Sequence, residues 1–387
     1  RVGATPRVGI DPSRSAPRRT GIDAPQIGWG QRSVVRALWR ATRQHRVART
    51  HVSTPMLTAR LLLLVAGVRV QGLTHTFKGF ATNYVKVSGG TSAAPPVVLV
   101  HGFGGSSGQW RATLEDLAAA GRTVYAVDLL GFGDSPKPRL AADDAYSIEL
   151  WADQLQHFVD EVVVAEDGAD QAVVVGNSIG SLACVCAAAA NPPSIAGVGL
   201  FNCAIGMNSK APPLPDDPVA YALFFNLIGK PLFALIDALL RSPLSTLLFD
   251  RVRTPEAVRS VLEGGVYQNG ARVDDELVRM LTRPAEDAGA RETFVEILTG
   301  APGPRPESLV PRISARTPIA CWWGPEDQVT PLIGVVAQFF RRLPAERAAT
   351  EFTLLPGTGH CPFDDRPDLA SPALIAWLDR EWPAACA

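Results

Sequence analysis

From residue 77 onward, short apolar runs alternate with longer segments that have helical periodicity. The runs are rich in β-branched residues and end in glycine-rich turns. Because they are apolar at nearly every position, we expect a parallel sheet covered by helices on both faces, an α/β architecture. Helices are expected over 148–164 and 181–190. The predicted strands are residues 85–89, 96–102, 123–131, 171–178, 197–204, 318–324 and 351–357.

The alternation stops between residues 206 and 315. This stretch has helical patterns only, over 219–250 and 274–298, with prolines dividing them. An all-helical insertion after one strand of an α/β sheet predicts a cap or lid. We therefore expect a core formed by residues 78–205 and 316–387, with a helical cap over 206–315.

The first 77 residues differ in composition from the rest of the chain. They contain thirteen arginines, no lysine and only two acidic residues. This composition is typical of an organelle transit peptide, so we expect residues 1–77 to lie outside the fold. Two alternatives stay open: a disordered basic arm, and a secretory signal starting at Met56, which precedes an apolar run.

Overall composition excludes several classes of function. The net charge of −1 gives no general attraction for nucleic acid. The six cysteines lack the spacing of a zinc site and the density of a disulfide framework, so we expect them to be reduced and mostly buried. No apolar run reaches the length of about 18 residues that a membrane span needs, the nearest being 61–68, so any membrane attachment is expected to be peripheral.

Residues 173–184 combine an apolar strand pattern, a Gly-x-Ser-x-Gly sequence and small helix-forming residues. In a tight strand-turn-helix, Gly176 and Gly180 leave room for the backbone while Ser178 lies exposed at the turn. Such a nucleophile elbow serves acyl transfer. An ordinary βα turn that contains a serine is the alternative, and the remaining motifs decide between them.

A serine nucleophile needs a base and an acid that orients the base. His360 lies in a glycine-rich turn after a predicted strand, whereas His45 and His51 precede the body and His157 lies in a helical pattern. Asp327 fits the Gly-x-x-Asp-x-x-x-Pro frame expected for the acid, although Glu326 beside it stays open. The order Ser178, Asp327, His360 is the one that such folds use.

The loop after the strand 96–100 can stabilise an oxyanion. Gly102 and Gly104 let this loop curl inward, so that the backbone N–H of Phe103 can join that of Ile179 at the developing charge. A phosphate-binding glycine loop is disfavoured, because the Gly-Lys-Ser/Thr ending of a P-loop is absent. We expect His101 to brace the loop. No metal or organic cofactor is implied.

These motifs resemble the α/β-hydrolase superfamily, and more closely the chlorophyll dephytylase and pheophytinase-like hydrolases of chloroplasts and cyanobacteria. The resemblance spans residues 78–379 and is carried by VLVHGFGGSSGQW, YAVDLLGFGDSPKP, YSIELWADQL, VGNSIGSLAC, LFNCAIGMNSKA, VDDELVRMLTRPAEDAGARETFVEILTG and GTGHCPFDDRPDL. It implies an α/β-hydrolase fold with an inserted cap and Ser178, Asp327 and His360 as triad. Pro325, where the family more often has an acid, and the loop 212–218 depart from the pattern.

The implied reaction is hydrolysis of the phytyl ester of chlorophyll or its derivatives. Serine rather than aspartate at position 178 favours acyl chemistry over dehalogenase or epoxide hydrolase chemistry. The implied location is the chloroplast, with peripheral contact to the thylakoid membrane, where the apolar cap could face lipid and Lys230, Arg241 and Arg251 could lie among headgroups. Alternatives are an esterase of galactolipids or other acyl lipids, a hydrolase-fold ligand receptor and an inactive interaction protein.

Overall fold

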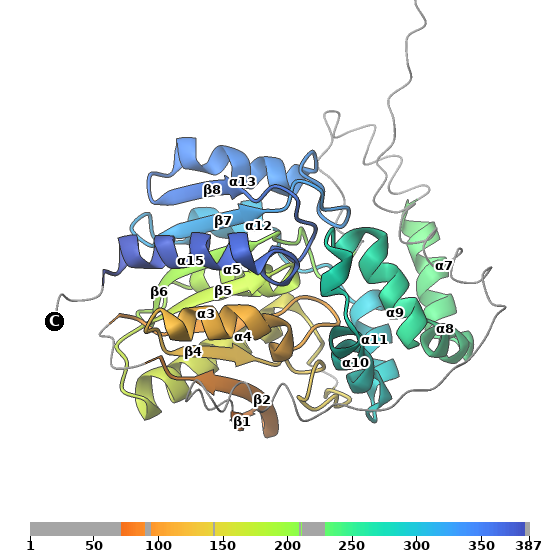
Figure 1. The fold of residues 1–387 in the computed structure, drawn as a ribbon. Helices are drawn as coiled ribbons and strands as arrows, with labels where there is room; N and C mark the ends of the chain where they lie inside the picture. The colour runs from red at the N-terminus through yellow and green to blue at the C-terminus, as the bar shows by residue number, and fades with distance from the viewer. Residues whose placement is uncertain (1–70, 90–93, 142–143, 209, 211–228, 384–387) are drawn as a thin grey trace, which may run out of the picture.

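The computed structural model describes residues 71–89, 94–141, 144–208, 210 and 229–383. In this part of the chain an eight-stranded sheet has the order β1-β2-β4-β3-β5-β6-β7-β8 (Figure 1). β1 and β2 pair antiparallel, β2 is antiparallel to β4, and the remaining pairs are parallel, which confirms the predicted mostly parallel sheet. The strands are β1 (Gln71–Phe77), β2 (Phe80–Val87), β3 (Val97–Val100), β4 (Val124–Val127), β5 (Ala172–Asn177), β6 (Ile195–Phe201), β7 (Ile319–Trp323) and β8 (Thr350–Leu354).

The central strands are apolar throughout because helices cover both faces of the sheet. Successive side chains point to opposite faces, so Val98 and Val100 pack into one core while Val97 and Leu99 pack into the other. Helices α4, α5 and α13 cover the first face, and α3 and α15 cover the second. Their bounds are α3 (Arg111–Ala119), α4 (Ile148–Phe158), α5 (Ile179–Ala188), α13 (Val335–Glu346) and α15 (Pro367–Glu381).

One edge of the sheet begins earlier than the sequence indicated. We expected the fold to start at residue 78, but β1 lies before that boundary and pairs along its whole length with β2. Leu73, His75 and Phe77 lie on its covered side and Thr74 and Thr76 on its exposed side, a pattern that suits an edge strand with only one covered face. His75, in β1, contacts His157 on α4 through ring nitrogens 2.8 Å apart.

Between β6 and β7 the described residues form helices without a strand, and helices α7 to α11 lie together beyond one end of the sheet (Figure 1). The longer elements are α7 (Lys230–Leu240), α8 (Leu244–Val252), α9 (Pro255–Val261), α10 (Asp275–Thr282) and α11 (Ala290–Thr299). Several predictions lie outside the described residues: the segment up to residue 70 with His45, His51 and Met56, the cap loop 212–218, the first part of the helical pattern 219–250, and Cys386.

Candidate active site

Ser178 lies at a strained corner between β5 and α5. Its φ of 56° and ψ of −121° are unusual for a residue with a side chain, and such conformations cost about 1–3 kcal/mol. A Cβ on Gly176 would collide with the Gly180 backbone, and one on Gly180 would collide with the backbone at His101. The two glycines therefore allow the tight turn that the sequence predicted around Ser178.

His360 and Asp327 come from two other loops at the carboxyl ends of strands. His360 Nδ1 lies 2.8 Å from Asp327 Oδ2, and both side chains are buried. Since Asp327 accepts the Nδ1–H, the ring nitrogen Nε2 is left as a proton acceptor. The structure thus brings together His360 and Asp327, the residues that the sequence predicted as base and acid.

Asp327 is held as a carboxylate by several donors. Thr330 Oγ1 and Asn202 Nδ2 donate to Oδ2 at 2.5 and 2.6 Å, and the backbone N–H of Val329 donates to Oδ1 at 2.6 Å. Burial raises the pKa of Asp327, but the His360 charge and the hydrogen bonds from His360, Thr330 and Asn202 outweigh burial and hold that pKa below its ordinary value. A permanent negative charge therefore faces the imidazole.

Glu326 has a different environment from Asp327. It is exposed, and its Oε1 accepts a hydrogen bond from the Gly357 N–H at 3.3 Å. Only Asp327 of the two bonds to His360, so the geometry favours Asp327 as the acid.

Asn177, which directly precedes Ser178, connects the nucleophile turn to the loop of His360. The Asn177 side chain donates to the carbonyl of His360 at 2.9 Å and to that of Phe201 at 3.2 Å. Ser178 is buried as well, and its Oγ forms no hydrogen bond to another residue that the structure describes. The bond from Ser178 to His360 that acyl transfer requires therefore remains a prediction.

The glycine-rich loop after β3 lies against the nucleophile. A Cβ on Gly102 would come within 3.1 Å of the Ser178 Cβ and within 2.9 Å of Asn177 Oδ1. Gly104 has a φ of 69°, which turns the loop. Within the described part of the chain, neither the Phe103 N–H nor the Ile179 N–H donates a hydrogen bond to another group, so both are available to an oxyanion.

His101 braces this loop. Its Nε2 accepts from the Leu129 N–H at 3.1 Å, so Nδ1 carries the proton that is donated to the Gly102 carbonyl 2.7 Å away. Burial lowers the pKa of His101, which favours the neutral ring, although Asp128 and the Gly102 bond act in the opposite direction. A fixed neutral imidazole suits support of the loop rather than proton transfer.

Several residues that tie the site together were not found from the sequence. Asn202, directly after β6, has a φ of 45° and joins the Asp327 side chain to the backbone N–H of Gly324. An asparagine at the carboxyl end of a buried strand tolerates such a φ and was the available signal. Asp365 is fully buried and accepts from the backbone N–H groups of Gly359, Gln268 and Asn269 at 2.7–2.9 Å.

The cap is therefore attached to the loop that carries His360. The Val266 carbonyl accepts the His360 N–H at 2.7 Å. Beside it, the buried Asp364 accepts from Arg111 Nε at 2.9 Å and from Arg272 at 2.5 Å, and from the Tyr267 hydroxyl at 2.9 Å. The position of the candidate base thus depends on cap residues 266–272.

An apolar pocket of about 460 Å³ lies between the cap and the oxyanion loop. Phe103, Gly104 and Phe132 line it from the core, and Phe249, Phe294 and Ile297 line it from the cap. The Phe103 ring contacts those of Phe132 and Phe294 at centroid distances of 5.7 and 6.1 Å. Pockets of this size bind small organic ligands, and this lining suits a hydrocarbon.

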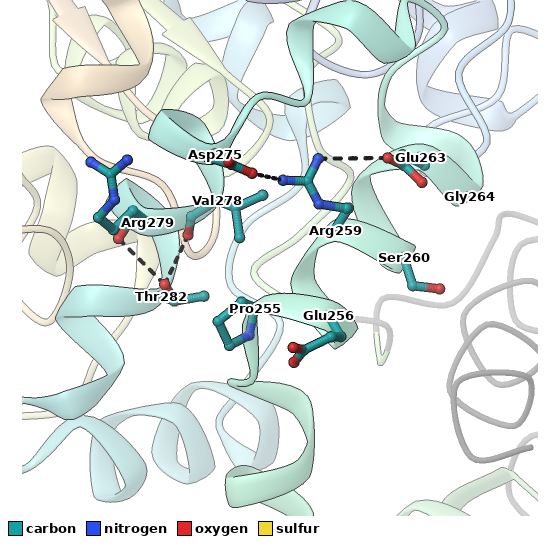
Figure 2. Close-up of a pocket in the computed structure, with 10 residues that line it drawn as sticks. All are labelled: Pro255, Glu256, Arg259, Ser260, Glu263, Gly264, Asp275, Val278, Arg279 and Thr282. Carbon is teal, nitrogen blue, oxygen red and sulfur yellow. Dashed lines mark hydrogen bonds and ion pairs between the residues drawn. The ribbon is translucent and has the colours of Figure 1, made fainter. Parts of the chain in front are cut away.

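Figure 2 shows a second pocket, of about 660 Å³, between α9 and α10 on the cap. Arg259 lies in its wall and forms ion pairs with Asp275 at 2.6 Å and Glu263 at 3.8 Å. Thr282 bonds to carbonyls of its own helix. Neither the oxyanion loop nor any of Ser178, Asp327 and His360 lines this pocket, so it is separate from the candidate site.

Known proteins share this fold and parts of this sequence. Pheophytinase, chloroplastic, from Arabidopsis thaliana is 25% identical over 336 residues, 76% of this chain and 63% of the relative. 1-Acylglycerol-3-phosphate O-acyltransferase ABHD5 from Sus scrofa is 35% identical over 121 residues, 31% of this chain and 33% of the relative. The chain thus spans less than two thirds of either protein.

Among solved structures, a membrane phospholipase A described as a bacterial virulence factor superposes with a TM-score of 0.58 at 24% identity, over 84% of this chain and 92% of that one. This likeness concerns the fold. A family model described as alpha/beta hydrolase family matches residues 97–371, which is most of the chain and includes Ser178, Asp327 and His360. The protein is therefore a member of the alpha/beta hydrolase family.

Proposed function

We propose that this protein is a serine ester hydrolase that removes phytol from chlorophyll or its derivatives. The observation that carries the proposal is a serine on a strained turn whose neighbour Asn177 bonds to the backbone of His360, together with a buried His360–Asp327 pair and an apolar pocket lined by the oxyanion loop. The match to a pheophytinase over 76% of the chain supports this substrate class.

In the proposed mechanism, His360 Nε2 takes the proton of Ser178 as Oγ attacks the ester carbonyl of the chlorin propionate. The backbone N–H groups of Phe103 and Ile179 stabilise the oxyanion, each worth about 2.7–4 kcal/mol in comparable enzymes. Phytol leaves with a proton from His360, and water, activated by the same imidazole, releases the acid. Asp327 orients His360 and stabilises its cationic form.

The cap suits the alcohol part of such a substrate. A phytyl chain needs apolar surroundings but no directional partner, and the pocket offers aromatic and aliphatic side chains. The chloroplast and the thylakoid membrane belong to this proposal. They are supported by the chloroplastic relative and by the arginine-rich composition of residues 1–77.

A second candidate is an esterase of acyl lipids, which the partial match to ABHD5 and the apolar pocket favour. Both candidates use the same site and differ in the ester. A ligand receptor on this fold would bind pigment but would not turn it over repeatedly.

The test is to incubate the purified chain with pheophytin, chlorophyll and galactolipid in separate detergent solutions and to separate the products by chromatography. We expect phytol together with pheophorbide or chlorophyllide, over many turnovers. Fatty acid release from galactolipid alone would favour the second candidate, and binding without turnover would favour a receptor.

Site variants complete this test. Ser178→Ala and Asp327→Asn should each reduce kcat by about 10³-fold or more, because triad members act as a unit. Glu326→Gln is the matched control, since this neighbouring carboxylate is exposed and does not bond to His360. Substantial activity in folded Ser178→Ala would overturn the assignment of the nucleophile.

A further inference from the structure

Helix α7 exposes an apolar stripe. Leu232, Leu235, Ile236 and Leu239 recur at the spacing that places side chains on one face of a helix. Such a stripe ordinarily faces a protein core, yet these four side chains are 40–58% exposed. The stripe therefore has no covering surface within the described part of the chain.

Helix α8 repeats the arrangement. Leu244, Leu247 and Leu248 have the same spacing and are 39–69% exposed, while Phe249 points inward and packs on Phe294 of α11 with ring centroids 5.4 Å apart. Both helices contact α11 and form the part of the cap that lies farthest from the sheet (Figure 1). We call the seven exposed residues of α7 and α8 the outer apolar face.

Positive charge flanks the outer apolar face. The two acids of these helices are neutralised, Asp237 by Lys210 at 2.7 Å and Asp250 by Arg253 at 3.0 Å. Lys230 and Arg251 form no ion pair with any residue that the structure describes, whereas Arg241 interacts electrostatically with Glu296 of α11. An apolar surface bordered by such cations matches the boundary between lipid tails and anionic headgroups.

The shape of the outer apolar face favours a broad surface over a partner helix. In the described ranges no single helix is long and apolar enough to cross a membrane; α7 and α8 meet that criterion only as a pair, bent by 86°. One partner helix could follow only one of two stripes that diverge by this angle. A bilayer surface can contact both.

The outer apolar face also continues into the apolar pocket. Leu248 is 39% exposed and Val261, on α9, is equally exposed, yet both side chains line the pocket beside the oxyanion loop. Val252 and Leu262 extend this lining inward. The apolar lining thus runs from the surface of the cap to Phe103 of the oxyanion loop.

We propose that the outer apolar face docks on a bilayer with anionic headgroups, so that the hydrocarbon chain of the substrate passes from lipid into the pocket beside Leu248 and Val261. The passage of substrate rests on the proposed function; the docking itself does not. Moving the chain from lipid into an apolar pocket avoids exposing its methylene groups to water.

The test is flotation of the full chain with vesicles of phosphatidylcholine, with and without phosphatidylglycerol. We expect binding that is stronger to the anionic vesicles. Leu235→Ser combined with Leu247→Ser should lower the fraction bound about tenfold or more. Ile333→Ser is the matched control, because Ile333 is 89% exposed and lies outside the cap; it should bind like the parent. Lys230→Gln with Arg251→Gln should weaken binding to the anionic vesicles only.

Lack of binding by the parent chain, or an equal loss in Ile333→Ser, would overturn the proposal. The proposal would also be overturned if the parent sedimented as a dimer and Leu235→Ser/Leu247→Ser as a monomer, because the outer apolar face would then join two copies of the chain. Rates of hydrolysis distinguish an effect on docking from an effect on catalysis. Leu235→Ser/Leu247→Ser should hydrolyse a soluble short-chain ester at the parent rate and should hydrolyse substrate held in vesicles more slowly than the parent. Flotation of Ser178→Ala equal to the parent, with no hydrolysis of any ester by the parent, would reject the proposed function and leave docking intact.

Discussion

The two sides of the helical cap meet the rest of the molecule in opposite ways. On the inner side, Leu277 of α10 is fully buried, and Asp364 of the core joins Arg111 to Arg272 of the cap. On the outer side, Leu235 of α7 is 58% exposed. The difference separates two tasks, since the inner side fixes the loop of His360 and the outer side offers apolar surface to the surroundings.

Removing the buried carboxylate of the inner side should have the largest effect on stability. Asp364→Ala leaves Arg111, Arg272 and Tyr267 without their common acceptor, and breaking a buried charge network of this kind costs about 3–5 kcal/mol. Urea unfolding measures the loss. Asp368→Ala, four residues away, is the control and should unfold like the parent, because Asp368 is exposed and pairs with the half-buried Arg366. If both variants lost the same unfolding free energy, the network around Asp364 would not be what holds the cap to the core.

Truncating the apolar contact of the inner side should have the next largest effect on stability. Leu277→Ala should lower the unfolding free energy by about 2–5 kcal/mol, because Leu277 packs between α10 and the core and its removal leaves a cavity. The change is measured by urea or thermal unfolding. A loss below about 1 kcal/mol would show that the inner side is looser than its burial indicates.

Asp365→Asn should affect catalysis through the position of His360. The carboxylate accepts three backbone N–H groups on both the cap and the His360 loop, and an amide supplies one acceptor oxygen only. We expect kcat on a short-chain ester to fall about 10- to 100-fold with little change in KM, since misplacing a catalytic group has costs of this order. A rise in KM at unchanged kcat would contradict a positioning role.

Acid should weaken the Asp327 contacts selectively. The pKa of Asp327 is lowered in the folded protein, so its stabilising contribution is present above the ordinary carboxyl pKa of about 3.9 and is lost as pH falls through the lower folded pKa. The difference in unfolding free energy between the parent and Asp327→Asn should therefore shrink below about pH 4. A difference that stays constant to the lowest measurable pH would contradict this prediction.

The outer side should tolerate substitution. Leu235→Ala should change the unfolding free energy by no more than about 0.5 kcal/mol, because the side chain buries little surface. Thermal unfolding of this variant beside Leu277→Ala compares the two sides of the cap directly. A loss as large as that of Leu277→Ala would mean that another part of the chain covers the outer face.

The sequence predicted the architecture because its strands carry a strong signal. Val97 to Val100 and Ala172 to Asn177 are apolar on both faces, which only a sheet covered on both sides explains. Asp327 and His360 could be predicted because each follows a strand within a recognisable turn, and the structure brings them together. Edge strand β1 escaped prediction because it is mostly polar and follows an arginine-rich segment, whose composition led us to place residues 1–77 outside the fold.

Other features depend on partners that are distant along the chain. Asp364 and Asp365 are adjacent in a polar turn, and nothing in that turn indicates that both are buried against cap residues about a hundred positions earlier. The spacing of leucines in α7 predicts one apolar face but not what covers it. Only the packed structure distinguishes Leu277, which faces the core, from Leu235, which faces outward.

Covalent labelling tests the assignment of Ser178 most directly. The purified chain is treated with a fluorophosphonate, which modifies activated serines, and the labelled peptide is identified by mass spectrometry. We predict a single adduct on Ser178, formed about 10³-fold or more slowly in Asp327→Asn and at the parent rate in Glu326→Gln. A folded, hydrolytically active chain that carries the adduct elsewhere, or that remains unlabelled, would contradict the site described for this hydrolase.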